Sequence, residues 1–253
     1  MTKVKQIFPE KTLKVIGNHS RLSSIHLQAQ SQYLSAVIHA GAHDLRSPLT
    51  VLKPYTDFLK KIEDKEQKTQ ILEKMKAAVD KAEAIINGLV EYTDIFLLDA
   101  PSIGKQYFET VWQEVQTLLC PTIADATIHI KTNFLAAPVI HYPQRYLEEL
   151  LYQLVLNSIQ YRHPGRVPNI QVSSQRVKQK VILTITDNGK GFDPEMQIDK
   201  IGMPFTKLKS NHKNVGLGLA KVRAIVEKNR GLFKMQSSSQ GTTIALHLLP
   251  YQE

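Results

Sequence analysis

The chain has 253 residues, of which 42% are hydrophobic and 22% are charged, and it contains one cysteine. This composition is that of an ordinary globular protein of one or two domains, and it excludes a fibrous, disordered or disulfide-framed chain. No apolar run approaches the roughly 18 residues that indicate a membrane span, and residues 1–14 lack the apolar core of a signal peptide. We therefore expect a cytoplasmic protein with no direct membrane span.

The formal net charge of +9 at pH 7 raises the question of a polyanionic partner. The basic residues are dispersed along the chain, and no tight basic run with interleaved aromatic residues occurs. This pattern favours solvated lysine-rich faces and no nucleic acid as partner. Attraction of polyphosphate or of an acidic partner is the alternative.

The N-terminal part of the chain carries a helical pattern. Residues 1–20 have weak periodicity and are interpreted as an arm or a helical lead-in. Residues 21–98 have apolar positions in alternating three- and four-residue steps, interrupted by a polar turn at 62–68. The two stripes consist of Ile38, Ala42, Leu45, Leu49, Leu52, Met75, Val79, Ala82, Ile86 and Leu89. Two antiparallel helices bury such stripes well when two chains form a four-helix bundle, so we expect a homodimer.

The segment Asp99-Ala100-Pro101-Ser102 ends the helical pattern and predicts a domain boundary, so that residues 99–253 form a second domain. Period-two alternation in this domain predicts strands at 105–108, 127–131, 139–142, 169–176, 180–186, 232–238 and 242–249. Helical patterns cover 109–119, 143–161 and 216–229. Strands and helices mixed in this way predict an α+β sandwich with the helices on one face of a sheet.

The segment His43-Asp44-Leu45-Arg46-Ser47-Pro48-Leu49 lies inside the first predicted helix. His43 flanks the apolar stripe, where a histidine is accessible to solvent. Asp44 is close enough to accept a proton from one ring nitrogen while the other acts as a nucleophile. Pro48 removes a helical hydrogen bond and predicts a kink. Without the other motifs, a surface histidine on a polar helix face would explain the pattern.

Three further blocks follow in order. Gln153 and Asn157 lie one turn apart on a predicted helix, and a neutral amide oxygen can bind Mg²⁺ without adding charge beside a triphosphate. The segment Asp187-Asn188-Gly189-Lys190-Gly191-Phe192 follows a predicted strand, and its glycines allow the backbone to approach a ligand closely. Gly216-Leu217-Gly218-Leu219 opens a helix whose N-terminal amides suit phosphate oxygens.

The order of these blocks resembles the transmitter region of two-component sensor histidine kinases, from about Ser31 to the C-terminus. The Asp-x-Gly-x-Gly arrangement is similar to the adenine box shared by histidine kinases, Hsp90 chaperones, type II topoisomerases and MutL-type repair ATPases. The resemblance implies an N-terminal helical hairpin that dimerises into a four-helix bundle. It also implies an ATP-binding domain of the GHKL (Bergerat) type, with ATP and Mg²⁺ as cofactors.

The resemblance also assigns roles to individual residues. His43 becomes the phosphoacceptor, Asp44 its acidic partner and Ser47 a candidate residue for phosphatase activity, where the family often has Thr or Asn. Asn157 becomes the metal ligand. The segment between the two glycine boxes is interpreted as a lid. The expected nucleotide-binding residues are Gln153, Asn157, Tyr161, Arg162, Asp187, Gly189, Gly191, Phe192, Phe205, Lys207, Gly216, Leu217, Gly218, Leu219 and Thr242.

The expected function is therefore ATP-dependent autophosphorylation of His43, followed by transfer to an aspartate of a response-regulator receiver domain. A separate sensor protein is a further expected partner. Departures from the family pattern at Gln153, Gln160, Gly202 and Asn214 keep a catalytically weak adaptor open as the alternative. An ATPase of the chaperone or topoisomerase kind would share the glycine boxes but lack the segment around His43.

Overall fold

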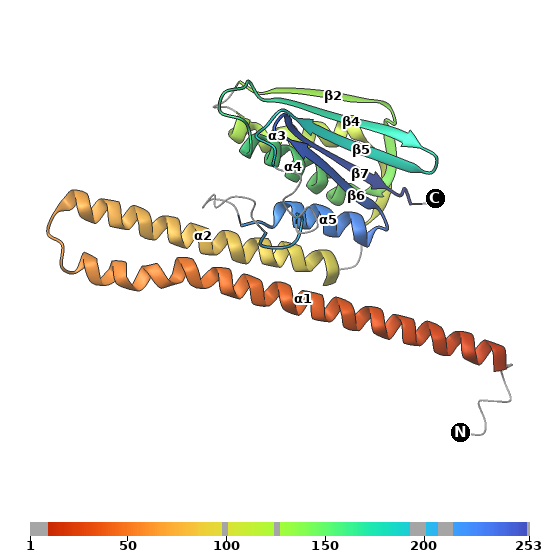
Figure 1. Cartoon of the computed structure of the whole chain (residues 1–253), viewed down its shortest axis with the longest axis horizontal. Coiled ribbons are helices and arrows are strands. Elements are labelled where there is room, and N and C mark those ends of the chain that lie inside the picture. The colour runs from red at the N-terminus through yellow and green to blue at the C-terminus, as the bar shows by residue number, and fades with distance from the viewer. Residues whose placement is uncertain (1–9, 98–100, 124–126, 193–200, 207–214, 252–253) are drawn as a thin grey trace. The chain divides into compact units, whose positions relative to one another are not determined.

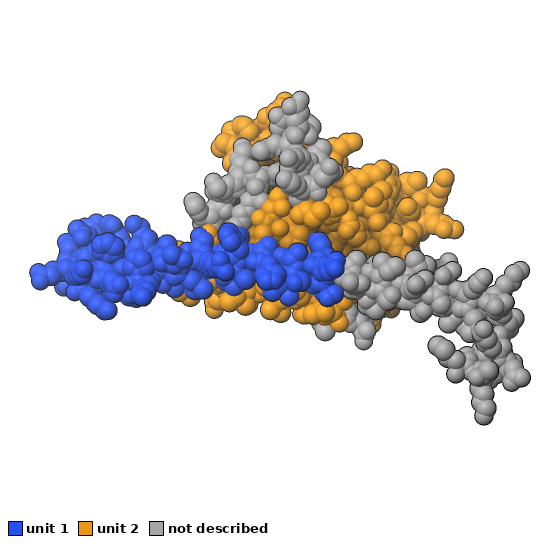
Figure 2. Space-filling view, turned by 60° about the horizontal axis from the view of Figure 1, so that its bottom comes forward, with its two compact units in different colours: residues 1–75 blue, residues 76–253 orange. Residues whose placement is uncertain are grey.

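The structure is a computed structural model that describes residues 10–97, 101–123, 127–192, 201–206 and 215–251, with backbone only over 10–30. The chain divides into two compact units, residues 1–75 and residues 76–253 (Figure 2). The second unit contains the C-terminal part of the second helix as well as both sheets. None of the helices in the described part of the chain has the length and apolar character needed to span a bilayer.

The first two elements form the helical hairpin, with α1 at Glu10–Leu59 and α2 at Lys65–Leu97 (Figure 1). The turn between them closes when Lys61 N and Ile62 N both donate to Phe58 O, at 2.9 and 3.1 Å. Asp64 then caps α2, since its Oδ1 accepts a hydrogen bond from Gln67 N at 2.7 Å. This cap explains why α2 begins inside the range predicted to be a turn. Helix α1 is continuous through the predicted kink at Pro48.

Large apolar side chains remain exposed along the hairpin. The exposed fractions are 49% for Ile38, 53% for Leu49, 47% for Val79 and 49% for Ile86. All four belong to the stripes predicted from the sequence. A single chain therefore leaves a substantial part of these stripes in contact with water.

In the described residues of the C-terminal domain, seven strands form two sheets. Strands β1 (Ile103–Tyr107) and β3 (Val139–Pro143) form a two-stranded antiparallel sheet. The larger sheet has the order β2-β4-β5-β7-β6, with β2 parallel to β4 and the other pairs antiparallel. Its strands are β2 (His129–Ala136), β4 (Asn169–Val177), β5 (Lys180–Asp187), β6 (Leu232–Ser238) and β7 (Gly241–Leu248).

Helices α3 (Phe108–Ile123), α4 (Gln144–Gln160) and α5 (Gly218–Lys228) cover one face of the larger sheet (Figure 1). The core lies between these two layers. Alternate residues of the central strands point into it, including Val181, Leu183 and Ile185, which are at most 2% exposed. From the helix side, Leu150 and Leu154 are equally buried. Each fully buried side chain of this size contributes about 1.5–3 kcal/mol to stability.

The α+β class with its helical hairpin is confirmed, while several element ends differ from the prediction. The strand predicted at 127–131 runs from His129 to Ala136, because β2 pairs with β4 along most of its length. The helix predicted from Gly216 begins at Gly218, because Gly216 has φ +83° and cannot belong to a right-handed helix. Tertiary pairing and one backbone conformation therefore decide these ends.

Candidate functional site

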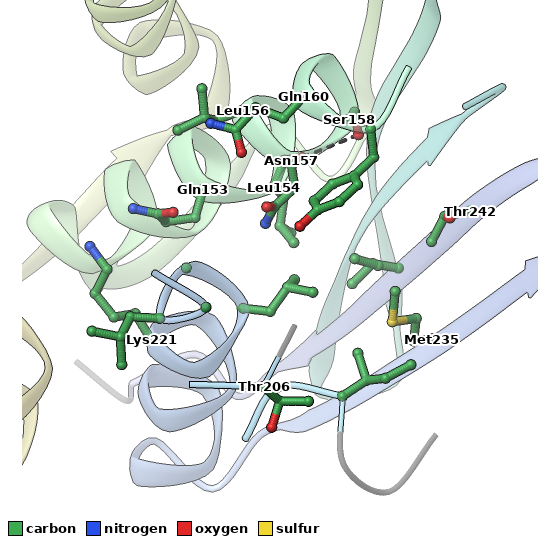
Figure 3. Close-up of a pocket in the computed structure, with 18 of the residues that line it drawn as sticks. Gln153, Leu154, Leu156, Asn157, Ser158, Gln160, Thr206, Lys221, Met235 and Thr242 are labelled. Carbon is green, nitrogen blue, oxygen red and sulfur yellow. Dashed lines mark hydrogen bonds between the residues drawn. The ribbon is translucent and has the colours of Figure 1, made fainter. Parts of the chain in front are cut away.

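A cavity of about 1040 Å³ opens between α4 and α5, within the unit of residues 76–253 (Figure 3). Its walls come from α4, the turn after β5, the start of α5, and strands β6 and β7. Residues 84–91 of α2 supply a further wall through Ala84, Asn87, Gly88 and Glu91. A cavity of this size is large enough to enclose a nucleotide.

Asp187 forms the most constrained polar group of the cavity. Its Oδ2 accepts a hydrogen bond from Ser158 Oγ at 3.1 Å, and its Oδ1 accepts from Gly189 N at 2.8 Å and Thr242 N at 3.3 Å. Burial raises the pKa of this carboxyl although all three hydrogen bonds act in the opposite direction. An ionised carboxylate has about four acceptor positions, so the three donors fix Asp187 while leaving capacity for a ligand.

Two glycines allow the backbone to approach closely around the cavity. Gly191 has φ +56°, and a Cβ there would lie 1.7 Å from Ser238 O. A Cβ at Gly218 would lie 2.5 Å from Gln153 Oε1, so a side chain would displace an amide of α4. Gly191 therefore requires glycine for both conformation and space, whereas a side chain at Gly218 would require the amide of Gln153 to move.

Helix α4 presents two amides to the cavity (Figure 3). Gln153 Nε2 donates to Glu149 Oε1 at 3.0 Å. Asn157 Nδ2 is buried and has no hydrogen-bond partner among the described residues. When the amide of Asn157 turns over, its oxygen takes the place of Nδ2. An unpaired buried amide is therefore suited to bind a ligand atom. Asn157 therefore fits the role of a Mg²⁺ ligand.

The start of α5 is suited to an anion. Helix α5 begins at Gly218, and no side chain of the described residues caps its N-terminus. Gly218 and Leu219, at the start of this helix, line the cavity, and the positive end of the helix dipole there attracts negative charge. Phe205 N donates to Gly216 O at 3.0 Å and ties the described end of the segment between the glycine boxes to this turn.

Lys221 is a buried cation that the sequence interpretation missed. Its Nζ contacts Glu149 Oε1 at 2.5 Å and Glu91 Oε2 at 2.8 Å, and its side chain is 9% exposed. Burial alone would lower the pKa of Lys221, but Glu149 and Glu91 outweigh burial and raise it. A lysine in the first turn of a helix opposes the helix dipole. A lysine at this unfavourable position in the sequence could therefore have indicated that acidic side chains lie close to it.

His43 lies in the unit of residues 1–75 with its side chain 81% exposed. Its Nδ1 is 3.7 Å from Asp44 Oδ1, so the two side chains meet although they are neighbours in the helix. Ser47 is also exposed, one turn further along α1. This arrangement leaves His43 Nε2 facing away from the carboxylate and accessible to a reagent from solvent.

The cavity brings together most of the residues expected to bind nucleotide. Arg162 is not among the lining residues, because its Nη1 donates to Ile159 O at 3.1 Å. Gly189 and Phe205 are also absent from the lining. Gly189 instead donates its backbone N–H to Asp187 Oδ1. Lys207 lies outside the described residues. The lining residues among those predicted are Gln153, Asn157, Tyr161, Asp187, Gly191, Phe192, Gly216, Leu217, Gly218, Leu219 and Thr242.

Ser158 is a second functional residue that the sequence interpretation missed. It is the neighbour of Asn157, and its Oγ is 3.1 Å from both Leu154 O and Asp187 Oδ2. A serine inside a run of buried helical residues needs a polar partner. That requirement was a local signal, although the identity of the partner depends on the sheet.

The comparisons with known proteins assign a family to each of the two parts of the chain. Residues 143–252 match the histidine kinase-, DNA gyrase B-, and HSP90-like ATPase family. Residues 29–95 match the His Kinase A (phospho-acceptor) domain. The chain therefore contains the two domains that make up the transmitter region of a sensor histidine kinase. The ATPase domain implies ATP binding, and the phosphoacceptor domain implies dimerisation.

Relatives support this assignment. Sporulation kinase B of Bacillus subtilis is 27% identical over 220 residues, which are 85% of this chain and 49% of the relative. The methanogenesis regulatory histidine kinase FilI of Methanothrix harundinacea is 24% identical over 88% of this chain and 25% of its own length. The chain thus spans about half, or less, of the length of these relatives.

Solved structures share the fold. The Acinetobacter baumannii histidine kinase AdeS has a TM-score of 0.64 at 21% identity, covering 83% of this chain and 98% of that one. The histidine kinase ThkA, solved in complex with the response regulator protein TrrA, has a TM-score of 0.71 at 17% identity over 88% of this chain and 64% of its own.

Proposed function

We propose that this chain is an ATP-dependent histidine autokinase that phosphorylates His43 and passes the phosphoryl group to an aspartate of a response regulator. The observation that carries the proposal is the pairing of two features. One is a cavity in which Asp187 is fixed by three hydrogen bonds beside the unpaired amide of Asn157. The other is an exposed histidine in contact with a carboxylate.

The two ends of the cavity would bind different parts of ATP. The carboxylate of Asp187 would accept a hydrogen bond from the adenine amino group, since it retains an acceptor position. The first turn of α5 would receive the phosphates at its free N–H groups. Asn157 would hold Mg²⁺, which neutralises triphosphate charge when bound. These positions orient the γ-phosphoryl group rather than react with it.

The chemical step follows from the contact at His43. Because Nδ1 faces Asp44, the lone pair of Nε2 would attack the γ-phosphorus. A P–N bond forms while the bond between the γ-phosphorus and the bridging oxygen breaks, and ADP leaves. The Nδ1 proton would pass to Asp44, so that the products are a neutral phosphorylated imidazole and ADP.

Transfer to a response regulator rests on the family and on the chemistry of a phosphorylated imidazole, and ThkA was solved with such a partner. Ser47 remains the candidate residue for phosphatase activity because it is exposed one turn beyond His43. The exposed stripes of α1 and α2 support a homodimer that closes a four-helix bundle. The stimulus would come from a sensor segment or from a separate sensor protein.

The test is incubation of the purified chain with γ-³²P-ATP and Mg²⁺, with acid-labile, base-stable label as the readout. His43→Ala and Asn157→Ala should abolish the label. His39→Ala is the matched control, because it is another exposed histidine on α1, and it should keep the label. Binding of ATP without any label would favour the adaptor. Label that survives His43→Ala would contradict the assignment of the phosphoacceptor.

A further inference from the structure

Arg166 lies in the loop between α4 and β4, and the function proposed above gives it no role. Its guanidinium donates to three backbone carbonyl oxygens: Asn188 at 3.3 Å, Gly189 at 3.4 Å and Ser239 at 3.1 Å. The first two belong to the turn that follows β5, and the third belongs to the turn between β6 and β7. Arg166 therefore bridges two turns that are distant in the sequence.

These two turns supply the backbone donors that fix Asp187. Gly189 N donates to Asp187 Oδ1 from the turn after β5, at 2.8 Å. Thr242 N donates to the same oxygen from the start of β7, at 3.3 Å. Because the two donors come from the two segments that Arg166 joins, the position of Oδ1 depends on how those segments are held together.

Other bonds hold the loop of Arg166 against the turn after β5. Lys190 N donates to Tyr161 O at 3.0 Å. Asn188 accepts from Asn169 N at 2.8 Å and donates to Val167 O at 2.9 Å. These contacts make the α4–β4 loop a rigid support for one turn, and the bond from Arg166 to Ser239 extends that support to the other.

We propose that Arg166 is a positioning residue that sets the preference of the cavity for adenine over guanine by holding both turns around Asp187. This inference rests on the proposed function, since it requires a purine nucleotide in the cavity. Adenine carries a donor amino group where guanine carries an acceptor oxygen. A fixed carboxylate therefore accepts a hydrogen bond from adenine and repels guanine. When Asp187 Oδ1 is held less firmly in place, the affinity for adenine falls, and the preference for adenine over guanine falls with it.

A cation near a nucleotide site could instead act by attracting phosphates, and the geometry argues against this role for Arg166. Its guanidinium is committed to three carbonyl oxygens at the Asp187 end of the cavity. A planar guanidinium donates along several fixed directions at once, whereas an ammonium acts as a point charge. Lysine at this position would therefore keep the charge and lose the bridge.

Arg176 provides a matched control. It is an exposed arginine whose Nη2 also donates to a backbone carbonyl oxygen, that of Val139 at 3.2 Å. Arg176 is not among the residues that line the cavity. Its substitution removes the same charge and one comparable hydrogen bond without touching the turns around Asp187.

The experiment is calorimetric titration of the whole chain with ATP and with GTP, for the wild type, Arg166→Ala, Arg166→Lys and Arg176→Ala. We expect the Kd for ATP to rise about tenfold in Arg166→Ala, which corresponds to one good charge-assisted hydrogen bond. The Kd for GTP should change little, so the ratio of the two should fall about tenfold. Arg166→Lys should lower the ratio similarly, and Arg176→Ala should leave it unchanged.

Three results would overturn the proposal. The first is an unchanged ratio in Arg166→Ala. The second is an equal loss of affinity for ATP and GTP, with full recovery in Arg166→Lys, because it would show attraction of phosphates. The third is the same fall in Arg176→Ala. If Arg166→Ala does not fold, the ratio in Arg166→Lys decides alone. Absence of ATP binding to the wild type would instead contradict the proposed function.

Discussion

The helical hairpin and the ATPase domain treat their apolar residues in opposite ways. In the ATPase domain, the large apolar residues of the central strands and of α4 are almost fully buried within one chain, as Leu150 and Leu183 show. In the hairpin, Val79 and Ile86 remain about half exposed. The first region carries the information for its own core. The second carries the information for a surface that another chain must complete.

The largest change in stability is expected from a substitution in the core of the ATPase domain. Leu150→Ala removes a fully buried side chain from α4, and we expect the free energy of unfolding to fall by about 2–5 kcal/mol. Chemical denaturation at several protein concentrations measures it, and the loss should not depend on concentration. Leu118→Ala is the control, because Leu118 is a leucine of α3 that is 61% exposed. An equal loss in both variants would contradict the assignment of the core.

Substitution in the exposed stripe should act on assembly instead. Ile86→Ala should weaken the proposed homodimer by about 1.5–3 kcal/mol, since each of the two chains loses about half the burial of one isoleucine at the interface. Analytical ultracentrifugation measures the dissociation constant. Glu83→Ala, one turn away on an exposed position, is the control. A wild-type chain that is monomeric at high concentration would remove the contrast between the two regions.

Asp187 extends the comparison to a charged residue, because it lies inside the ATPase domain, whose apolar core is buried within one chain. Asp187→Asn keeps the shape and can donate from Nδ2 to Ser158, so the fold should persist. Adenine loses a charged acceptor worth roughly 1.5–3 kcal/mol, and ATP should bind about 10- to 100-fold more weakly. Titration with ATP measures the loss. Unchanged affinity would exclude Asp187 as the adenine acceptor.

The same variant carries a pH signature. Burial raises the pKa of Asp187 in the folded chain above its ordinary value of 3.8, so folding favours the protonated carboxyl. The resulting stabilisation is complete below the ordinary pKa and is lost as pH rises through the raised pKa. Relative to Asp187→Asn, the wild type should therefore lose stability as pH rises from about 3.8 toward neutrality. Denaturation of both proteins across this range measures the difference, and an opposite slope would contradict the direction of the shift.

The smallest expected effect concerns the ion pairs of Lys221. Lys221→Met removes the ammonium and leaves the carboxylates of Glu149 and Glu91 without their cation. Because these side chains are 30% and 56% exposed and water can solvate them, we expect a loss of only about 1 kcal/mol. Glu149→Gln should be compared with it, because it leaves the ammonium with the more exposed Glu91. Thermal denaturation of the two variants measures both effects. A larger loss in Lys221→Met than in Glu149→Gln would show that the ion pairs hold α2 on the domain.

The sequence could predict a motif where its residues are neighbours in the chain. The segment around His43, the Asp187 turn and the glycines that open α5 are each contiguous, and their backbone requirements appear as glycine or proline at fixed spacing. The alternating patterns likewise predicted most strands within a few residues. Nothing in a local pattern could set the ends of β2, because pairing with β4 decides them.

The sequence could not predict contacts between residues that are far apart in the chain. Lys221 and Glu91 are separated by 130 positions, and Arg166 and Ser239 by 73. Local spacing says which residue types stand on one face of a helix, but not which turn of another element will face them. Arg162 also depends on a detail that a local pattern does not contain. The sequence predicts nucleotide binding by Arg162, and in the structure its guanidinium donates to Ile159 O in the last turn of α4.

Helix α2 has two kinds of neighbour within a few residues. Asn87 and Gly88 form part of the cavity wall, while Ile86 and Val90 are exposed large apolar side chains. Because a helix is stiff about its axis, a rotation of α2 that buries Ile86 and Val90 also moves Asn87 and Gly88. In the proposed homodimer, the packing of α2 against another chain would therefore affect the shape of the cavity.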